Sequence, residues 1–157
     1  MPGRRRSTGK SPSSETTVTY LLDTNVLSET VKAQPDPQVV AWLEETPLGE
    51  AYLSALTWGE LVQGVVRAPV GRRRALESWL RGVRRSFQGR ILPLDLPVME
   101  VWGRLVGEAF LKGKPLSPLD AMLAATALHH GLVLVTRNAR HFEGLPIALF
   151  NPWGGAE

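Results

Sequence analysis

Short apolar segments of the chain alternate with longer segments in which apolar residues recur every three or four positions. The short segments lie at residues 18–22, 50–54, 91–94, 132–135 and 147–150, and their apolar, often β-branched or aromatic composition is typical of buried strands. An alternation of strands and helices predicts a mostly parallel sheet with helices on both faces. The predicted fold class is therefore α/β, a three-layer α/β/α sandwich.

Polar residues and prolines mark where the predicted helices begin. Asp23 and Thr24 can cap one helix, and Ser117 with Pro118 opens another. Gly131 is placed to end the latter helix. The predicted helices span about residues 23–31, 36–45, 58–66, 76–87, 95–109 and 117–130.

The formal net charge of +3 is concentrated at the start of the 157-residue chain. Residues 1–17 carry four basic residues and one acid among glycine, proline, serine and threonine, whereas the remainder has no net charge. We therefore expect a disordered basic tail at residues 1–17 and one compact domain at residues 18–153. A weak contact with nucleic acid and an incorrectly assigned start of the chain are both compatible with such a tail.

The chain has no cysteine, which excludes disulfides, zinc–thiolate sites and thiol nucleophiles. This composition fits a reducing cytoplasm, where we expect the protein to reside. The most apolar stretch, residues 121–135, is interrupted by His129 and His130 and is too short to span a membrane. We expect no membrane contact.

Three carboxylates and one amide are placed to meet at one edge of the predicted sheet. Asp23 follows the first strand and Asn138 the fourth, whereas Glu60 lies two turns into the helix after the second strand. Asp120 lies in the first turn of the helix before the fourth strand. Ligand sites of parallel sheets lie at the carboxyl ends of the strands. The topology thus allows these four side chains to gather there.

Each acidic residue also has a purely structural interpretation. Asp23 could simply cap a helix, and the Ser117-x-x-Asp120 spacing resembles a capping box. Glu60 is harder to explain in this way, because it shares a helix face with Thr57 and Gly64. Buried carboxylates that repel one another are stabilised by a divalent cation, and oxygen ligands without cysteine suit Mg²⁺ or Mn²⁺. Such an ion binds phosphate and lowers the pKa of water, which predicts phosphodiester hydrolysis.

Four sequence motifs, in order, resemble those of the PIN-domain family, in particular its VapC and FitB-like group. They are LDTNVLSE at residues 22–29, Ser54-x-x-Thr57-x-x-Glu60-Leu61, LDAMLAATA at residues 119–127, and VTRN at residues 135–138 with HFEGL at residues 141–145. The closing FNPW at residues 150–153 is similar to the end of FitB-like members. The resemblance covers about residues 18–153.

The resemblance implies a PIN-like nuclease domain in which Asp23, Glu60 and Asp120 hold Mg²⁺ or Mn²⁺. In this interpretation Asn138 joins the catalytic set by positioning water or the scissile phosphate. The donors that fix the carboxylates are Thr24, Asn25, Thr57 and Thr136. The resemblance further implies an RNA substrate, a homodimer, and inhibition by a cognate antitoxin protein that carries a DNA-binding module, as in VapBC toxin–antitoxin systems.

An arginine-rich segment is a candidate RNA contact. Eight basic residues and only one acid lie between residues 67 and 90. A solvated helix face is the usual explanation, but the excess of one sign favours a track for phosphates. The candidate contacts are Arg73, Arg74, Arg81, Arg84, Arg85 and Arg137, although Arg137 is equally suited to a structural salt bridge.

Two departures from the family pattern leave other functions open. Asn138 stands where many PIN domains carry a fourth carboxylate, and His141 stands where aspartate is frequent. One alternative is therefore a catalytically weak binding module that pairs with a DNA-binding antitoxin to regulate its operon. Another is a DNA-directed nuclease, although the chain lacks the length for extra DNA-gripping elements.

Overall fold

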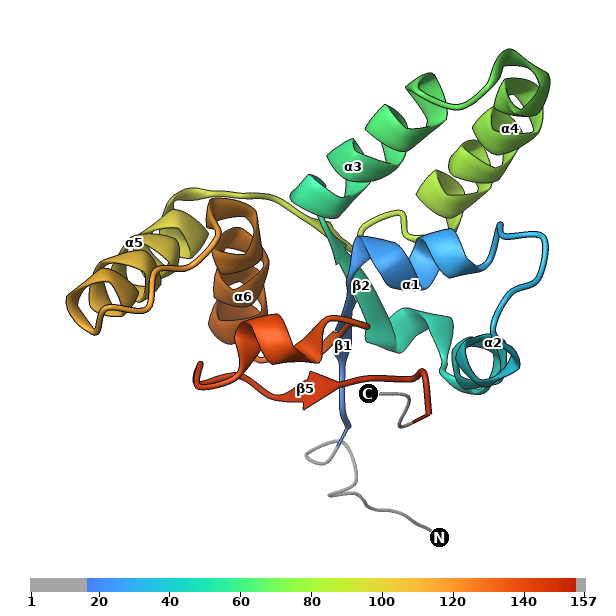
Figure 1. Ribbon diagram of the computed structural model, residues 1–157. Helices are drawn as coiled ribbons and strands as arrows, with labels where there is room; N and C mark the ends of the chain where they lie inside the picture. Colours follow the sequence, from blue (N-terminus) through green and yellow to red (C-terminus); the bar gives the residue numbers. More distant parts are fainter. Residues whose placement is uncertain (1–16, 155–157) are drawn as a thin grey trace, which may run out of the picture.

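The computed structural model describes residues 17–154, in which five parallel strands form one sheet in the order β3-β2-β1-β4-β5 (Figure 1). The strands are β1 (Tyr20–Leu22), β2 (Ala51–Ser54), β3 (Ile91–Leu92), β4 (Val133–Val135) and β5 (Leu149–Phe150). Neighbouring strands pair in parallel throughout. The predicted α/β class with a parallel sheet is confirmed. The tail expected at residues 1–17 lies, except for residue 17, outside the described residues.

Helices connect the strands at nearly the predicted positions. They are α1 (Thr24–Glu29), α2 (Pro37–Glu45), η3 (Leu48–Glu50), α3 (Ala55–Val66), α4 (Val70–Ser86), α5 (Leu96–Leu111), α6 (Pro118–His130) and η4 (Ala139–Phe142). Side chains of Asp23, Asp36, Ser54, Asp95 and Ser117 accept hydrogen bonds from N–H groups in the first turns. Capping of this kind satisfies amides that have no partner within the helix.

Alternate residues of the strands face two separate cores. Leu21 of β1 and Leu134 of β4 pack with α5 and α6, whereas Leu22 and Val135 pack with residues of α1 to α4. Figure 1 shows α5 and α6 on one side of the sheet and α1 to α4 on the other. Because side chains alternate across a strand, two successive leucines serve both helical layers. The predicted sandwich is therefore present.

Several predicted boundaries differ from the structure, and two of these differences have a local reason. Helix α4 begins at Val70, six residues before the apolar pattern starts, because Pro69 permits a helix directly after it. Helix α1 ends at Glu29, earlier than predicted. Strand β3 ends at Leu92, and the next residue, Pro93, has no N–H for a strand ladder. None of these differences moves a predicted site residue to another edge.

The point where the chain changes direction across the sheet lies between β1 and β4. The chain proceeds from β1 outward through β2 to β3, and then returns to place β4 on the other side of β1. In open α/β sheets, ligands bind at such a switch point, beyond the carboxyl ends of the strands. Asp23 follows β1 and Thr136 follows β4, so both residues lie at this point. Among the helices of residues 17–154, none combines the length and apolar character needed to cross a membrane.

Two glycines allow a test of the boundary between α6 and β4. Gly131 has a φ of 67° and ends α6, whereas Gly107 lies inside α5, where an added Cβ would meet no atom within 4 Å. Gly131→Ala is expected to lower the free energy of unfolding by about 1 kcal/mol, because a Cβ disfavours this conformation. Gly107→Ala should raise it by about 0.5–1 kcal/mol through helix propensity. Urea denaturation measures both changes, and equal effects of the same sign would contradict the assigned boundary.

Candidate active site

Asp23 occupies the junction of β1 and β4 and uses both of its carboxylate oxygens. Its backbone N–H donates to the Val135 carbonyl at 2.9 Å, which extends the pairing of the strands by one residue. Its Oδ1 accepts from the Thr24 N–H at 2.7 Å, and its Oδ2 accepts from the Thr136 hydroxyl at 2.8 Å. In one conformation, Asp23 can therefore both cap α1 and serve in the candidate site.

Further hydrogen bonds join the loops that follow β1 and β4. The Asn25 amide nitrogen lies 3.5 Å from Asp23 Oδ2, and its Oδ1 accepts from the Arg137 N–H at 3.3 Å. The Asn138 N–H donates to the Thr136 hydroxyl oxygen at 3.0 Å. The Thr136 hydroxyl therefore accepts a hydrogen bond from the loop after β4 and donates one to the Asp23 carboxylate after β1. The Asn138 side chain remains exposed at the rim.

Glu60 reaches the same edge from α3. The Thr24 hydroxyl donates to Glu60 Oε1, so the first residue of α1 orients a carboxylate from a different helix. Thr57, one turn before Glu60, is 0% exposed, and its hydroxyl has no hydrogen-bond partner among the described residues. Of the four predicted donors, Thr24, Asn25 and Thr136 therefore lie beside the carboxylates. Thr57 makes no hydrogen bond to any carboxylate of the site.

Asp120 comes from the first turn of α6 and is 34% exposed. Its Oδ2 lies 3.5 Å from Nδ1 of His141, which η4 presents after β4. The predicted capping bond from Ser117 is also present, because the Asp120 N–H lies 3.5 Å from the Ser117 hydroxyl. His141 is a neighbour of the site that the sequence identified only as a departure from the family pattern.

The carboxylates of the site influence one another electrostatically. Burial raises the pKa of the Asp23 carboxyl above its ordinary value, and the hydrogen bonds from Thr136 and Thr24 partly oppose this shift. The negative charges of Glu60 and Asp120 raise the pKa of Asp23 further. Glu60 and Asp120 are therefore each close enough to repel the charge of Asp23, and a divalent cation relieves such repulsion.

The donor set suits an oxygen-seeking divalent ion. Within residues 17–154, no group of three or more His, Asp or Glu side chains is arranged closely enough to hold a metal ion. The charges of Glu60 and Asp120 nevertheless both act on Asp23, and the buried hydroxyl of Thr57, one turn before Glu60 in α3, is unpartnered in the described part of the chain. Carboxylate and hydroxyl oxygens with few nitrogen donors are typical of Mg²⁺ or Mn²⁺ sites. The residues present thus fit such an ion.

A groove of about 280 Å³ extends from Glu60 between α1, α3 and α4. Leu61, Val65 and Trp79 contribute apolar lining, and Lys32 and Arg72 contribute positive charge. The Arg72 guanidinium also donates to the Val31 carbonyl at 3.3 Å, which ties α4 to the end of α1. The groove thus places two positive side chains near Glu60. The sequence did not predict this pairing of Lys32 with Arg72, because the two residues lie far apart along the chain.

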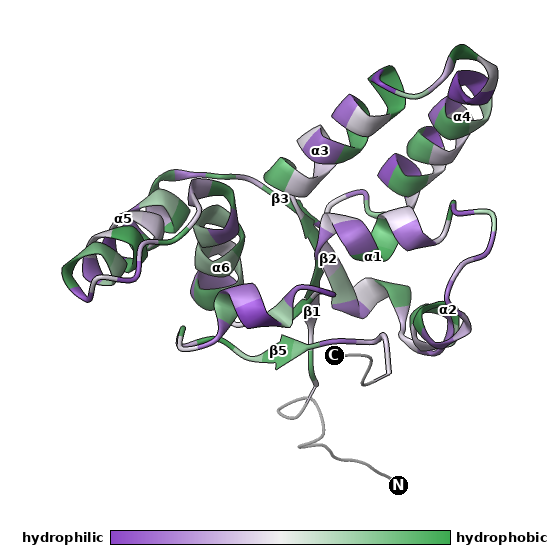
Figure 2. Cartoon of the chain, viewed as in Figure 1, coloured by the Kyte–Doolittle hydropathy of each residue, from purple (hydrophilic) through white to green (hydrophobic). Residues whose placement is uncertain are grey.

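The arginines of the candidate RNA track occupy different environments. Arg73 donates to the carbonyls of Val66 and Ala68, at 2.8 and 3.3 Å, and therefore helps to close the turn between α3 and α4. The Arg84 guanidinium lies 5.7 Å from the centre of the Trp58 ring. The exposed members of the track on α4 are Arg74, Arg81, Arg84 and Arg85. Figure 2 shows hydrophilic and hydrophobic bands alternating along α4.

Arg137 and Glu29 lie near the site but outside the set of carboxylates described above. The Arg137 guanidinium lies 5.3 Å from the centre of the Trp153 ring, and its charge acts on Glu29. Glu29 is buried, accepts from the Asp36 N–H at 2.8 Å, and pairs with Lys32 at 2.9 Å. Among residues 17–154 Arg137 forms no ion pair, so its contact with phosphate and its structural salt bridge both stay predictions. Glu29 was not singled out by the sequence, because its partners become neighbours only when α1 packs against the following loop.

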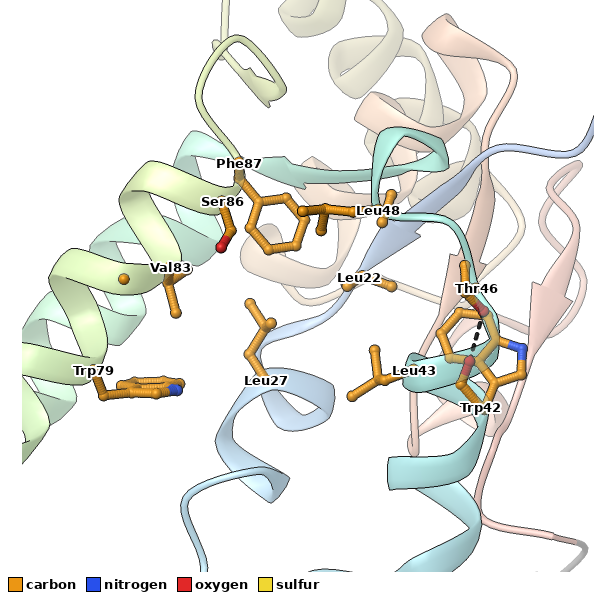
Figure 3. Close-up of a pocket in the computed structure, with 12 residues that line it drawn as sticks. Leu22, Leu27, Trp42, Leu43, Thr46, Leu48, Trp79, Val83, Ser86 and Phe87 are labelled. Carbon is orange, nitrogen blue, oxygen red and sulfur yellow. Dashed lines mark hydrogen bonds between the residues drawn. The ribbon is translucent and has the colours of Figure 1, made fainter.

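An apolar cavity of about 400 Å³ lies apart from this chemistry (Figure 3). Its wall comes from α1, α2 and α4, with Leu27, Leu43 and Trp79 pointing into it. Thr46 faces it as well, but its hydroxyl donates to the Trp42 carbonyl at 2.7 Å. The described residues that line it include no ionisable side chain. The cavity lining therefore cannot supply acid, base or metal ligands.

Comparison with known proteins gives a consistent set of relatives. A family model described as PIN domain matches residues 20–146. Toxin FitB of Neisseria gonorrhoeae is 40% identical over 135 residues, which cover 85% of this chain and 97% of that protein. A VapC ribonuclease of Sinorhizobium fredii is 39% identical over 135 residues, covering 85% and 96%. The crystal structure of FitAcB from Neisseria gonorrhoeae has a TM-score of 0.83 at 39% identity, covering 87% of this chain and 99% of that one.

Removal of the Thr136 hydroxyl should change the titration of Asp23. Thr136→Val deletes a hydrogen bond that lowers the pKa of Asp23, so this pKa is expected to rise further above its ordinary value. A ¹³C NMR titration of the aspartate carboxyl carbons measures the change. Thr126→Val is the matched control, because Thr126 is equally buried but donates to the Met122 carbonyl. An unchanged Asp23 titration in Thr136→Val would contradict the described contact.

Glu29 should make the stability of the fold sensitive to acid. The hydrogen bond from Lys32 lowers the pKa of Glu29 most, burial opposes this, and the Asp36 N–H lowers it further. A carboxyl with a lowered folded-state pKa stabilises the fold above the unfolded pKa of about 4.3, and this contribution disappears as the pH falls through the folded-state value. The difference in free energy of unfolding between the wild type and Glu29→Gln should therefore shrink from about pH 7 to about pH 3. Urea titrations at both pH values measure it, and a constant difference would contradict the prediction.

Proposed function

The chain belongs to the PIN domain family, since the family model covers residues 20–146 and the FitB toxin is 40% identical to it; on this premise we propose that it is the ribonuclease toxin of a VapBC-type toxin–antitoxin pair. The observation that carries the proposal is the placement of Asp23 at the switch point, where Thr136 holds it and the charges of Glu60 and Asp120 act on it. A parallel sheet places its reactive groups at this edge.

The proposed cofactor is Mg²⁺ or Mn²⁺, held by Asp23, Glu60 and Asp120. When bound, such an ion would neutralise phosphate charge and lower the pKa of water for attack on phosphorus. The oxygen donors and the mutual repulsion of the carboxylates support this proposal. The expected products are those of phosphodiester hydrolysis in RNA.

The remaining residues of the site would fix the carboxylates before substrate arrives. The Thr136 hydroxyl aims Asp23 Oδ2, and the Thr24 N–H holds Oδ1. The Thr24 hydroxyl aims Glu60, which would orient the attacking water or complete the ligand set. Carboxylates held in this way need little rearrangement during the reaction, which lowers its barrier. The exposed amide of Asn138 would position water or the scissile phosphate at the rim.

RNA would approach along the positive side chains near the carboxylates. Lys32 and Arg72 line the groove that begins at Glu60. Arg74, Arg81 and Arg85 are exposed on α4 and would extend this surface toward more distant phosphates. Contacts with phosphates supply affinity without reading sequence. The carbonyl contacts of Arg73 make it a weaker candidate than its neighbours.

The similarity to a named toxin also suggests partners and location. We propose that a cognate antitoxin protein inhibits the nuclease, and that the toxin acts as a homodimer. Because RNA is the proposed substrate, we also propose that the protein acts in the cytoplasm. A catalytically weak binding module remains the competing proposal, because Asn138 stands at a position where a carboxylate would strengthen metal binding.

Cleavage of RNA by the purified protein tests the proposal directly. RNA and DNA strands of the same sequence are incubated with Mg²⁺ or Mn²⁺, or with EDTA. We expect cleavage of RNA only, and only with metal. Asp23→Asn should lower the rate at least about 100-fold, because it removes one charge from the ligand set while preserving a residue that can cap α1.

Asp36→Asn is the matched control. Asp36 caps α2 as Asp23 caps α1, but its carboxylate is bonded to the N–H groups of Gln38 and Val39. Its replacement should leave the rate within about twofold, because asparagine caps as well as aspartate. Intact RNA under every condition, with antitoxin absent and the protein folded, would favour the binding module. Cleavage of DNA alone would identify a DNA-directed nuclease.

A further inference from the structure

An imidazole lies beside the Asp120 carboxylate of the candidate site. Nδ1 of His141 is 3.5 Å from Oδ2 of Asp120, and the two side chains are 60% and 34% exposed. A charge-assisted hydrogen bond between such groups is shorter, at about 2.7–2.9 Å. The imidazole nitrogen is therefore near the carboxylate without being tightly bound to it, and both groups are open to a third partner.

The local fold holds His141 in this place. The His141 N–H donates to the Asn138 carbonyl at 3.0 Å, which closes the first turn of η4. The next residue, Phe142, is 1% exposed and packs with Leu123 and Ala124 of α6 in the core. Because Phe142 anchors η4 against α6, its neighbour His141 projects from the same short turn toward the start of that helix.

The separation of the two atoms suits joint coordination of one ion. Two ligands at right angles around a small divalent metal, with bonds of about 2.1 Å, lie about 3 Å apart. His141 Nδ1 and Asp120 Oδ2 approach this separation already. A small rotation of either exposed side chain would bring them to it.

We propose that His141 is a nitrogen ligand of the metal site and that it shifts the preference of this site from Mg²⁺ toward Mn²⁺. The inference rests on the proposed function, because it assumes that Asp120 takes part in metal binding. Mg²⁺ strongly prefers oxygen ligands, whereas affinity for nitrogen ligands rises along the first-row transition metals that begin with Mn²⁺. One imidazole among three carboxylates therefore favours Mn²⁺ without excluding Mg²⁺.

Direct binding measurements on the whole chain test this role without relying on activity. Mn²⁺ affinity is measured by electron paramagnetic resonance of the free ion, and Mg²⁺ affinity by its competition with Mn²⁺. His141→Asn should weaken Mn²⁺ binding about tenfold and Mg²⁺ binding less than about twofold.

His129→Asn is the matched control. His129 is exposed near the end of α6, nine residues after Asp120, which corresponds to about 13.5 Å along the helix axis. Its replacement should leave both affinities unchanged. Circular dichroism verifies that each variant is folded.

Two results would overturn the inference and leave the proposed function intact. One is unchanged binding of both ions by His141→Asn, and the other is an equal loss for both, which would make His141 only a positioning residue for Asp120. A wild-type protein that binds neither ion would have a different meaning. It would overturn the proposed metal site itself, and the role of His141 with it.

Discussion

The pairing of β1 with β4 is the constraint on which the site depends. The bond from the Asp23 N–H to the Val135 carbonyl continues this pairing past the end of β1. It places Asp23 opposite Thr136, so that a hydroxyl and a carboxylate meet at 2.8 Å. A slip of one residue would turn every side chain of β4 to the other face. It would remove Thr136 from Asp23 and exchange Leu134 with Val135 between the two cores.

The same pairing explains why the site can hold charge at the edge of an apolar core. Asp23 follows two fully apolar, buried residues, and burial is the largest cause of its raised pKa. Both oxygens of Asp23 are held by fixed hydrogen bonds. Asp120 and His141 are partly exposed and lie 3.5 Å apart, so these two side chains can adjust to a ligand.

Local patterns were sufficient to predict the fold and the acidic residues. Asp23 and Ser117 lie next to the helices that they cap. Successive strand residues such as Leu21 and Leu22 point to opposite faces of the sheet, so both faces follow from the strand pattern. The Thr24 hydroxyl donates to Glu60, 36 residues away, so the contact that its predicted role requires is present. Thr57 was expected to play the same role, but its hydroxyl makes no hydrogen bond within residues 17–154. The position of a residue on a helix does not by itself determine where its hydroxyl points.

Contacts between distant segments could not be predicted, and they decide what each charged side chain is able to do. Arg73 and Arg74 are neighbours in one basic run, yet Arg73 closes the turn after α3, whereas Arg74 is exposed. From composition alone, both arginines are equal candidates for contacts with RNA phosphates. The guanidinium of Arg73 already donates to two carbonyls, so it has fewer donors left for RNA than that of Arg74. Near Glu60, Lys32 from the loop after α1 and Arg72 from α4 line one groove, so the positive charge beside a carboxylate depends on how distant segments pack and not on the density of arginine along α4.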